Sequence, residues 1–162
     1  MRFELIDRIV ELASGERIVA VKAVSNAEEY LADHFAAFPV LPGVFMLETL
    51  VESGAWLVRE AQDFANTVIL LREAKNVVFK SFVRPGNLLR VEVACRRLAQ
   101  GESDFEGVGY CNRDEVVKAR FGLRHFCLAD RDALLSSADS RLAAEARARL
   151  ADLRRHPPAA RE

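Results

Sequence analysis

The sequence predicts an α+β fold in which one long buried helix is wrapped by an antiparallel sheet of about five or six strands. Two observations lead to this prediction. Residues 43–60 place apolar side chains on nearly every side of a helix, as expected of a helix in a protein core. Four strand-like stretches follow this helix, separated by short polar turns.

The composition is that of a globular protein of one domain's size. The chain has 162 residues, of which 51% are hydrophobic and 29% charged, which excludes disordered and collagen-like proteins. Because 23 Lys and Arg face 24 Asp and Glu, no overall field would attract nucleic acid. The three cysteines form no C-x-x-C pair, which argues against a disulfide framework and a zinc site and favours the reducing cytoplasm. Neither an export signal nor a membrane span is expected.

A predicted strand and a proline precede the long helix. Residues 17–25 are rich in β-branched side chains and are followed by a polar cluster, so they are expected to form a strand that ends in a turn. Pro42 stands just before the long helix, where its missing N–H does no harm. Unpaired backbone amides at Gly43, Val44 and Phe45 would then form a site for an anion or a carbonyl oxygen.

The strand-like stretches lie near residues 67–72, 75–83, 88–98 and 103–128, the last divided at residues 112–114. In the third stretch apolar and polar residues alternate, which is typical of a sheet with one face on the core and one in water. Such a sheet leaves edges, so dimerisation by edge pairing is expected.

The chain changes character after residue 129, which suggests a division into a domain of residues 1–129 and a helical extension of residues 130–162. Ala and Arg dominate the extension. Apolar residues recur at helical spacing in it, at Leu142, Ala146, Leu150 and Leu153. We expect this helix to pack on the domain surface or on a partner subunit.

Two functional groups stand in unusual surroundings. His34 opens an apolar, proline-containing loop that leads into the long helix, and Glu48 lies within that helix among apolar residues. Burial would raise the pKa of this carboxyl, so a protonated acid and a neutral imidazole could coexist near pH 7 as a general acid and a general base. Glu52 lies one turn further on, and repulsion would push one of the two carboxyls towards its protonated form. The alternatives are a structural histidine and a Glu48 that is hydrogen-bonded in the core or at a dimer seam.

The stretch His34 to Glu48, H-F-A-A-F-P-V-L-P-G-V-F-M-L-E, resembles the active-site signature H-F-P-x-x-P-V-x-P-G-V-x-x-x-E. This is the signature of the FabZ-like 3-hydroxyacyl-[acyl-carrier-protein] dehydratases, which have the hotdog fold. Residues 3–9, 84–88 and 105–107 resemble other parts of that family, so the resemblance covers about residues 3–128.

The resemblance implies that His34 removes the α-proton of a 3-hydroxyacyl thioester and that Glu48 protonates the departing hydroxyl, leaving a trans-2-enoyl product. The Gly43 N–H would hold the thioester carbonyl. The other substrate-binding residues implied are Phe35, Pro42, Val44 and Glu52.

The resemblance also implies a catalytic partner and an assembly. Each site would combine His34 of one subunit with Glu48 of another, in a homodimer or a trimer of dimers, without a metal or cofactor. Acyl carrier protein would be the partner, met by a local basic patch whose candidate residues are Lys80, Arg84, Arg96, Arg97 and Arg124.

Three departures from the family pattern stand beside these agreements. Ala36 replaces a proline, Glu52 replaces a glutamine, and residues 84–87 alter a turn. A thioesterase or CoA-linked hydratase of the same fold is therefore an alternative, as is a non-catalytic acyl-binding or scaffold subunit. One hypothesis is that Glu52 raises the pKa of the catalytic acid.

Overall fold

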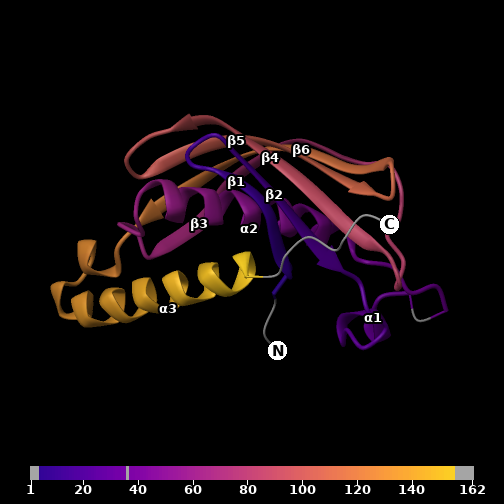
Figure 1. Ribbon diagram of the computed structural model, residues 1–162, viewed down its shortest axis with the longest axis horizontal. Coiled ribbons are helices and arrows are strands. Elements are labelled where there is room, and N and C mark those ends of the chain that lie inside the picture. Colours follow the sequence, from indigo (N-terminus) through magenta and orange to yellow (C-terminus); the bar gives the residue numbers. More distant parts are fainter. Residues whose placement is uncertain (1–3, 36, 156–162) are drawn as a thin grey trace.

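The computed structural model describes residues 4–35 and 37–155, which form one six-stranded sheet with helices on one side of it (Figure 1). The elements in chain order are β1 (Arg8–Ala13), β2 (Arg17–Ala23), α1 (Tyr30–Asp33), α2 (Gly43–Ala61), β3 (Val68–Phe79), β4 (Leu88–Leu98), β5 (Glu102–Cys111), β6 (Asp114–Phe126), two short 3-10 turns at Leu128–Asp130 and Ala133–Leu135, and α3 (Ser136–Arg154).

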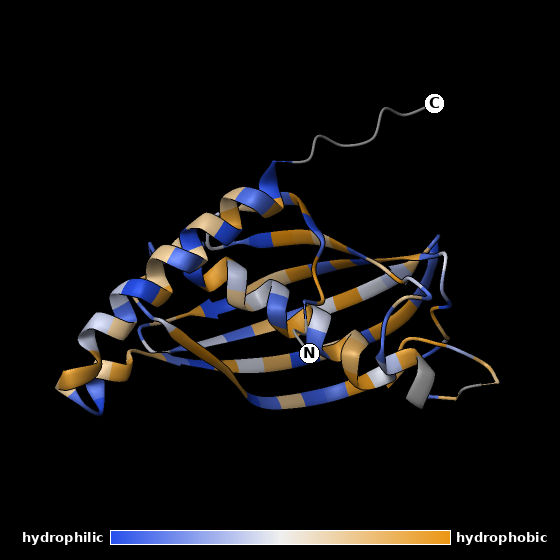
Figure 2. Ribbon diagram, turned by 90° about the horizontal axis from the view of Figure 1, so that it is seen from below, coloured by the Kyte–Doolittle hydropathy of each residue, from blue (hydrophilic) through white to orange (hydrophobic). Residues whose placement is uncertain are grey.

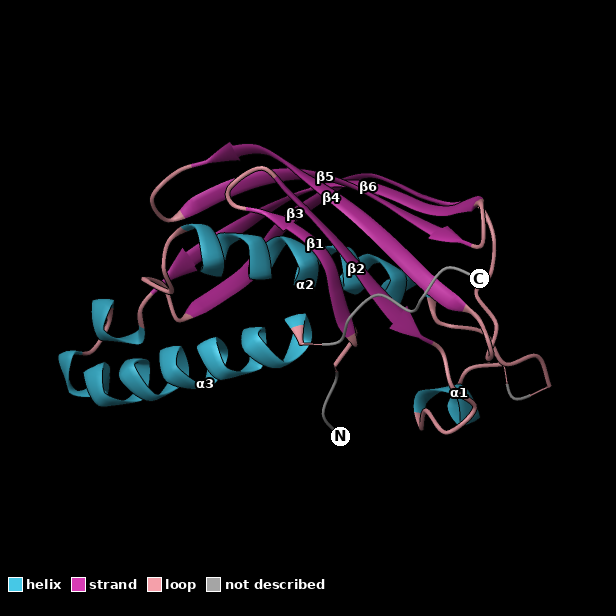
Figure 3. Cartoon of the chain, in the orientation of Figure 1, coloured by secondary structure: helices cyan, strands magenta, loops and turns pink. Residues whose placement is uncertain are grey.

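The sheet is antiparallel throughout, in the order β1-β2-β4-β5-β6-β3. The chain leaves β2, forms α1 and α2, and returns as β3 at the opposite edge, so α2 lies across the inner face of the sheet (Figure 3). The predicted α+β architecture of a long helix wrapped by an antiparallel sheet is confirmed.

Two predictions about strands were wrong. The stretches predicted at residues 67–72 and 75–83 are replaced by one strand, β3 (Val68–Phe79), whose register against β6 shifts twice and whose Asn76 has a φ of 51°. These irregularities interrupt the alternation of side chains, which is why the sequence suggested two strands. The edge strand β1 was not predicted, since it is only six residues long and mostly exposed or half-buried.

Helix α2 approaches the sheet closely on one side. A Cβ atom on Gly54 would lie 2.9 Å from Cε2 of Phe121, and one on Gly107 would lie 3.0 Å from Cδ2 of Leu50. The two glycines therefore let the helix and sheet backbones come together around a packed core. Met46, Leu50 and Leu57 fill that interface and are almost completely buried.

Helix α3 packs against the same core. Leu150 and Leu153 are buried in it, and Asp139 accepts hydrogen bonds from the hydroxyl of Thr67 and from two backbone N–H groups, of Leu128 at 3.0 Å and Ala129 at 2.8 Å. Figures 1 and 2 show α3 beneath the C-terminal half of α2 and α1 at the other end of the molecule. No helix in residues 4–35 and 37–155 is long and apolar enough to span a bilayer.

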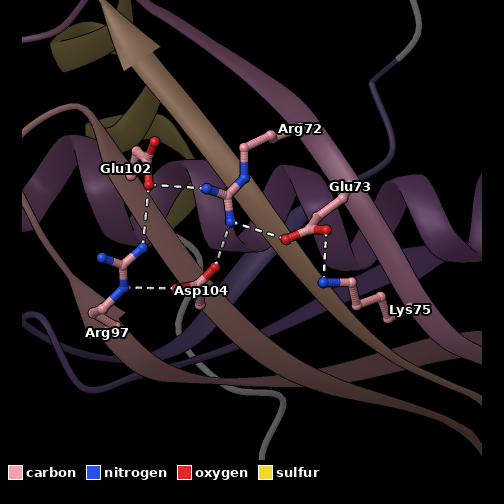
Figure 4. Close-up of polar contacts among 6 residues, drawn as sticks. All are labelled: Arg72, Glu73, Lys75, Arg97, Glu102 and Asp104. Carbon is pink, nitrogen blue, oxygen red and sulfur yellow. Dashed lines mark hydrogen bonds and ion pairs between the residues drawn. The ribbon is translucent and has the colours of Figure 1, made fainter.

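The outer face of the sheet carries a network of ion pairs (Figure 4). Arg72 bonds Glu102 at 2.8 Å and Asp104 at 2.9 Å, and Arg97 bonds the same two carboxylates. Glu73 joins the network through Arg72 and Lys75. Exposed pairs of this kind contribute little stability, and they identify this face as one that is turned to water.

Candidate active site

The start of α2 offers free backbone donors. Pro42 precedes the first helical residue, and the N–H groups of Gly43 and Val44 have no acceptor within the described chain. Phe45, also expected to be free, donates to the Pro42 carbonyl at 2.9 Å. A Cβ atom on Gly43 would lie 3.3 Å from the ring of Phe79, so glycine leaves room beside the two free amides. A carbonyl oxygen that gains negative charge would be stabilised here.

His34 lies at the end of α1, close to the start of α2. Tyr30 of α1 packs edge-on against Phe45 of α2, with ring centroids 4.8 Å apart, and so fixes α1 to the first turn of the long helix. The half-buried His34 ring lies 4.4 Å from the ring of Phe35, whose φ of 51° is unusual for a residue other than glycine. Ala36, where the family pattern has a proline, lies outside the described part of the chain.

The prediction that Glu48 is buried within the helix was wrong for the single chain. Helix α2 presents one side to the sheet, whereas Glu48 is on the other side, where its side chain is exposed. Nearby protein nevertheless excludes enough water to raise the pKa of Glu48 above its ordinary value. The shift is in the direction that suits a general acid.

Glu48 lines a pocket of about 290 Å³ between α2 and the beginning of β3, which we call the Glu48 pocket. Its lining residues are Glu48, Val51, Glu52, Ala55, Arg59, Ile69, Leu70 and Leu71. His34 is not among them, so this pocket within one chain does not combine the two proposed catalytic groups.

Glu52 is held firmly beside this pocket. Its carboxylate accepts hydrogen bonds from the N–H of Leu5 at 2.9 Å and from Nε1 of Trp56 at 3.4 Å. Burial raises the pKa of Glu52, and the charge of Glu48 raises it further. Burial is the main cause of the shift at Glu48, and since the repulsion between the two carboxylates is mutual, the hypothesis that Glu52 raises the pKa of Glu48 stays a prediction.

Three of the predicted substrate-binding residues, Pro42, Gly43 and Val44, lie at the start of α2, whereas Glu52 lies in its middle and Phe35 lies in the loop after α1. Val44 and Phe35 have apolar side chains that are 66% and 61% exposed. Exposed apolar groups beside unpaired amides offer a surface to a ligand or a second subunit.

One pocket residue, Arg59, was missed. Its guanidinium lies over the ring of Trp56, 5.1 Å from the centroid. Positions 48, 52, 55 and 59 recur at helical spacing, which could have identified Arg59 once Glu48 was singled out.

The predicted basic patch is dispersed. Lys80 pairs with Glu115, Arg96 with Glu106, and Arg97 with Glu102 and Asp104. Arg84 differs, because it lies over the ring of Phe38 in the loop that follows His34, 4.5 Å from the centroid. Within the described residues, no group of three His, Cys, Asp or Glu side chains is placed to hold a metal ion.

Comparisons with known proteins agree with this geometry. Residues 1–120 match the FabA-like domain family. The chain is 41% identical over 99 residues to the 3-hydroxyacyl-[acyl-carrier-protein] dehydratase FabZ of Chloroflexus aggregans, covering 61% of this chain and 69% of that protein. It is 34% identical over 131 residues to FabZ of Geobacillus thermodenitrificans, covering 81% and 88%.

A solved structure, the dehydratase heterocomplex ApeI:P from Xenorhabdus doucetiae, is similar in fold. Its TM-score is 0.67 at 16% identity, with 82% of this chain and 90% of that chain covered. The sequence signature, the sheet wrapped around α2 and these relatives lead to one assignment: the chain belongs to the FabA-like family as a FabZ-like dehydratase of the hotdog fold.

Proposed function

We propose that the protein is a hydro-lyase that dehydrates 3-hydroxyacyl groups on acyl carrier protein to trans-2-enoyl thioesters, in fatty-acid or related acyl-chain biosynthesis. The observation that carries the proposal is that the free amides of Gly43 and Val44 and the acid Glu48 lie together near the start of α2. Helix α1, whose C-cap is His34, is held against the same end of α2 by the contact of Tyr30 with Phe45. The FabZ relatives support the choice of substrate.

In the proposed reaction, His34 takes the α-proton of the thioester. The electron pair of that C–H bond forms the new double bond while the bond from C3 to its hydroxyl breaks. Glu48 gives its proton to the departing oxygen, so water leaves. The amides of Gly43 and Val44 stabilise the negative charge that develops on the thioester oxygen.

The site is proposed to form between two subunits. Strand β3 is an edge of the sheet, and its Leu70, Leu71, Val78 and Phe79 are between 40% and 54% exposed. An exposed apolar edge of this kind favours pairing with a second copy. A second chain paired along β3 would cover the Glu48 pocket and bring its own His34 to it, in a dimer or a trimer of dimers.

Acyl carrier protein is proposed to dock near Arg84, which lies beside the loop that follows His34. An acidic surface on the carrier protein would supply the opposite charge to Arg84. We place the reaction in the cytoplasm, where Cys95, Cys111 and Cys127, all free thiols, would stay reduced.

The test is mass spectrometry of carrier-bound 3-hydroxyacyl substrates incubated with the purified protein. An enoyl product with its thioester intact is expected. Release of free acid would instead identify a thioesterase, and no turnover would identify a binding or scaffold subunit. Turnover of CoA-linked but not carrier-bound substrate would identify the hydratase alternative.

His34→Ala and Glu48→Gln should each lower turnover by a factor on the order of 10² to 10⁴ without unfolding the protein. If the site is shared, dissociating and reassociating the two inactive variants together should restore up to about a quarter of the wild-type activity, because half of the dimers then hold one intact site. Reassociation of each variant alone is the control. Absence of recovery in verified mixed dimers would place both groups in one chain.

A further inference from the structure

The Glu48 pocket changes in character along its length. Glu48, Glu52, Ala55 and Arg59 follow one face of α2, over a rise of about 16 Å between the first and the last. Ile69, Leu70 and Leu71 of β3 form an apolar wall of the same pocket. An acyl chain that starts at Glu48 and runs along this face would pass Ala55 and the apolar wall and reach Arg59.

Arg59 is a half-buried cation near Glu52, whose charge favours the charged form of the guanidinium. Within the described chain its guanidinium makes no hydrogen bond and no ion pair, although it lies over the ring of Trp56. Burial lowers the pKa of Arg59, since desolvation disfavours the charged form. A guanidinium is a five-donor group whose desolvation is costly unless an acceptor replaces water.

Helix α3 closes the region beyond Arg59. A second pocket, of about 310 Å³, lies between α2 and α3. Its lining residues are Glu52, Trp56 and Arg59 of α2, Thr67, and Leu142, Glu145, Ala146 and Arg149 of α3. Arg149 differs from Arg59 in that it already bonds Glu4, at 3.0 Å. Helix α3 lies outside residues 1–120, which match the family, so this closure is a feature added to the family domain.

We propose that the acyl chains this site prefers end in a carboxylate, which Arg59 binds at the far end of the Glu48 pocket. This inference rests on the proposed function and names its substrate class. A carboxylate would accept two parallel N–H bonds from the planar guanidinium, whereas a methyl end would leave those donors unpaired. Glu52 is engaged by the N–H of Leu5 and by Nε1 of Trp56, and it forms no ion pair with Arg59 within the described residues.

The experiment compares two carrier-bound 3-hydroxyacyl substrates of equal chain length, one ending in a carboxylate and one in a methyl group. The wild-type protein should have the higher kcat/KM for the carboxylate-ended substrate. Arg59→Met should lower kcat/KM for that substrate by a factor on the order of 10 to 100, mostly through KM, and should leave the methyl-ended substrate unchanged or improved. Arg59→Lys keeps the charge but loses the planar pair of N–H donors, so its kcat/KM for the carboxylate-ended substrate should lie between those of the wild type and Arg59→Met.

The matched control is Arg141→Met, which removes an arginine from an exposed position of α3. It should change neither substrate, and thermal unfolding of each variant checks that the fold is kept. Equal wild-type preference for both substrates, or an equal loss of both in Arg59→Met, would overturn the carboxylate inference while dehydration of the methyl-ended substrate still upheld the proposed function. If neither substrate were dehydrated, the proposed function and this inference would both fail.

Discussion

The two sides of α2 have opposite characters. On one side Gly54 lies so close to the sheet that a single added carbon would meet the ring of Phe121. On the other side the next residue, Ala55, lines the Glu48 pocket together with two glutamates and Arg59. One side is filled by this chain's own side chains, whereas the other keeps room and charged groups.

One side of the helix therefore contributes mainly to the stability of the fold, and the other side carries the groups that are proposed to react with or bind the substrate. The sheet-facing side removes apolar area from water and so contributes to folding. The pocket-facing side includes charged groups whose desolvation is unfavourable, and these groups have a use only when a substrate or a second subunit meets them.

The largest effect on stability should follow a change on the sheet-facing side. Leu50 is completely buried against the sheet, so Leu50→Ala should lower the free energy of unfolding by about 2 to 5 kcal/mol through lost burial and a cavity. Urea denaturation measures this value. The comparison is Leu70→Ala on the pocket side, at a side chain that is 54% exposed, which should change stability by under about 1 kcal/mol but reduce turnover of long acyl chains. Equal destabilisation by both changes would contradict the proposed division.

A smaller and more local effect is expected where α3 is attached. Asp139 accepts three hydrogen bonds that hold the start of α3 to the chain around Thr67 and Leu128. Asp139→Ala should accelerate amide hydrogen exchange in residues 136–154 by about 10-fold or more, with much less change in α2.

The bond from Thr67 is the main reason that the pKa of Asp139 is lowered. A lowered pKa means that the carboxylate stabilises the fold above the ordinary Asp pKa and that this contribution is lost as pH falls through the folded value. The protection of α3 amides, measured relative to the intrinsic exchange rate at each pH, should therefore fall at acid pH in the wild type and less so in Asp139→Ala. A uniform acceleration throughout the sheet would show that α3 is not a separate local unit.

The smallest effect should come from Glu52. Its pKa is raised by burial, so the folded state holds the proton more tightly than the unfolded state. The resulting stability is fully present below the unfolded pKa and is lost as pH rises through the folded value. Glu52→Gln should thus stabilise the protein relative to wild type more at pH 8 than at pH 5.

Chemical denaturation at the two pH values measures this difference. Glu11→Gln, a change at a half-exposed position of β1, is the control for removal of one carboxylate. A difference between wild type and Glu52→Gln that does not vary with pH would contradict the raised pKa.

The sequence predicted the architecture because its signals are local. The apolar residues of 43–60 and the alternation in 88–98 follow from helix and strand periods, and both elements formed within two residues of their expected bounds. The irregular β3 and the short β1 were predicted wrongly or missed, since a register shift weakens the period and six residues give too few repeats.

The sequence by itself determined which groups could perform the chemistry: His34, Glu48 and the amides that Pro42 leaves free at the start of a helix. Only the tertiary structure decided that Glu48 faces away from the sheet, that His34 does not line its pocket, and that Arg59 lies at the pocket's far end. The physical reason is that residue type and periodicity act along the chain, whereas the water that a side chain loses depends on what packs against it from distant segments.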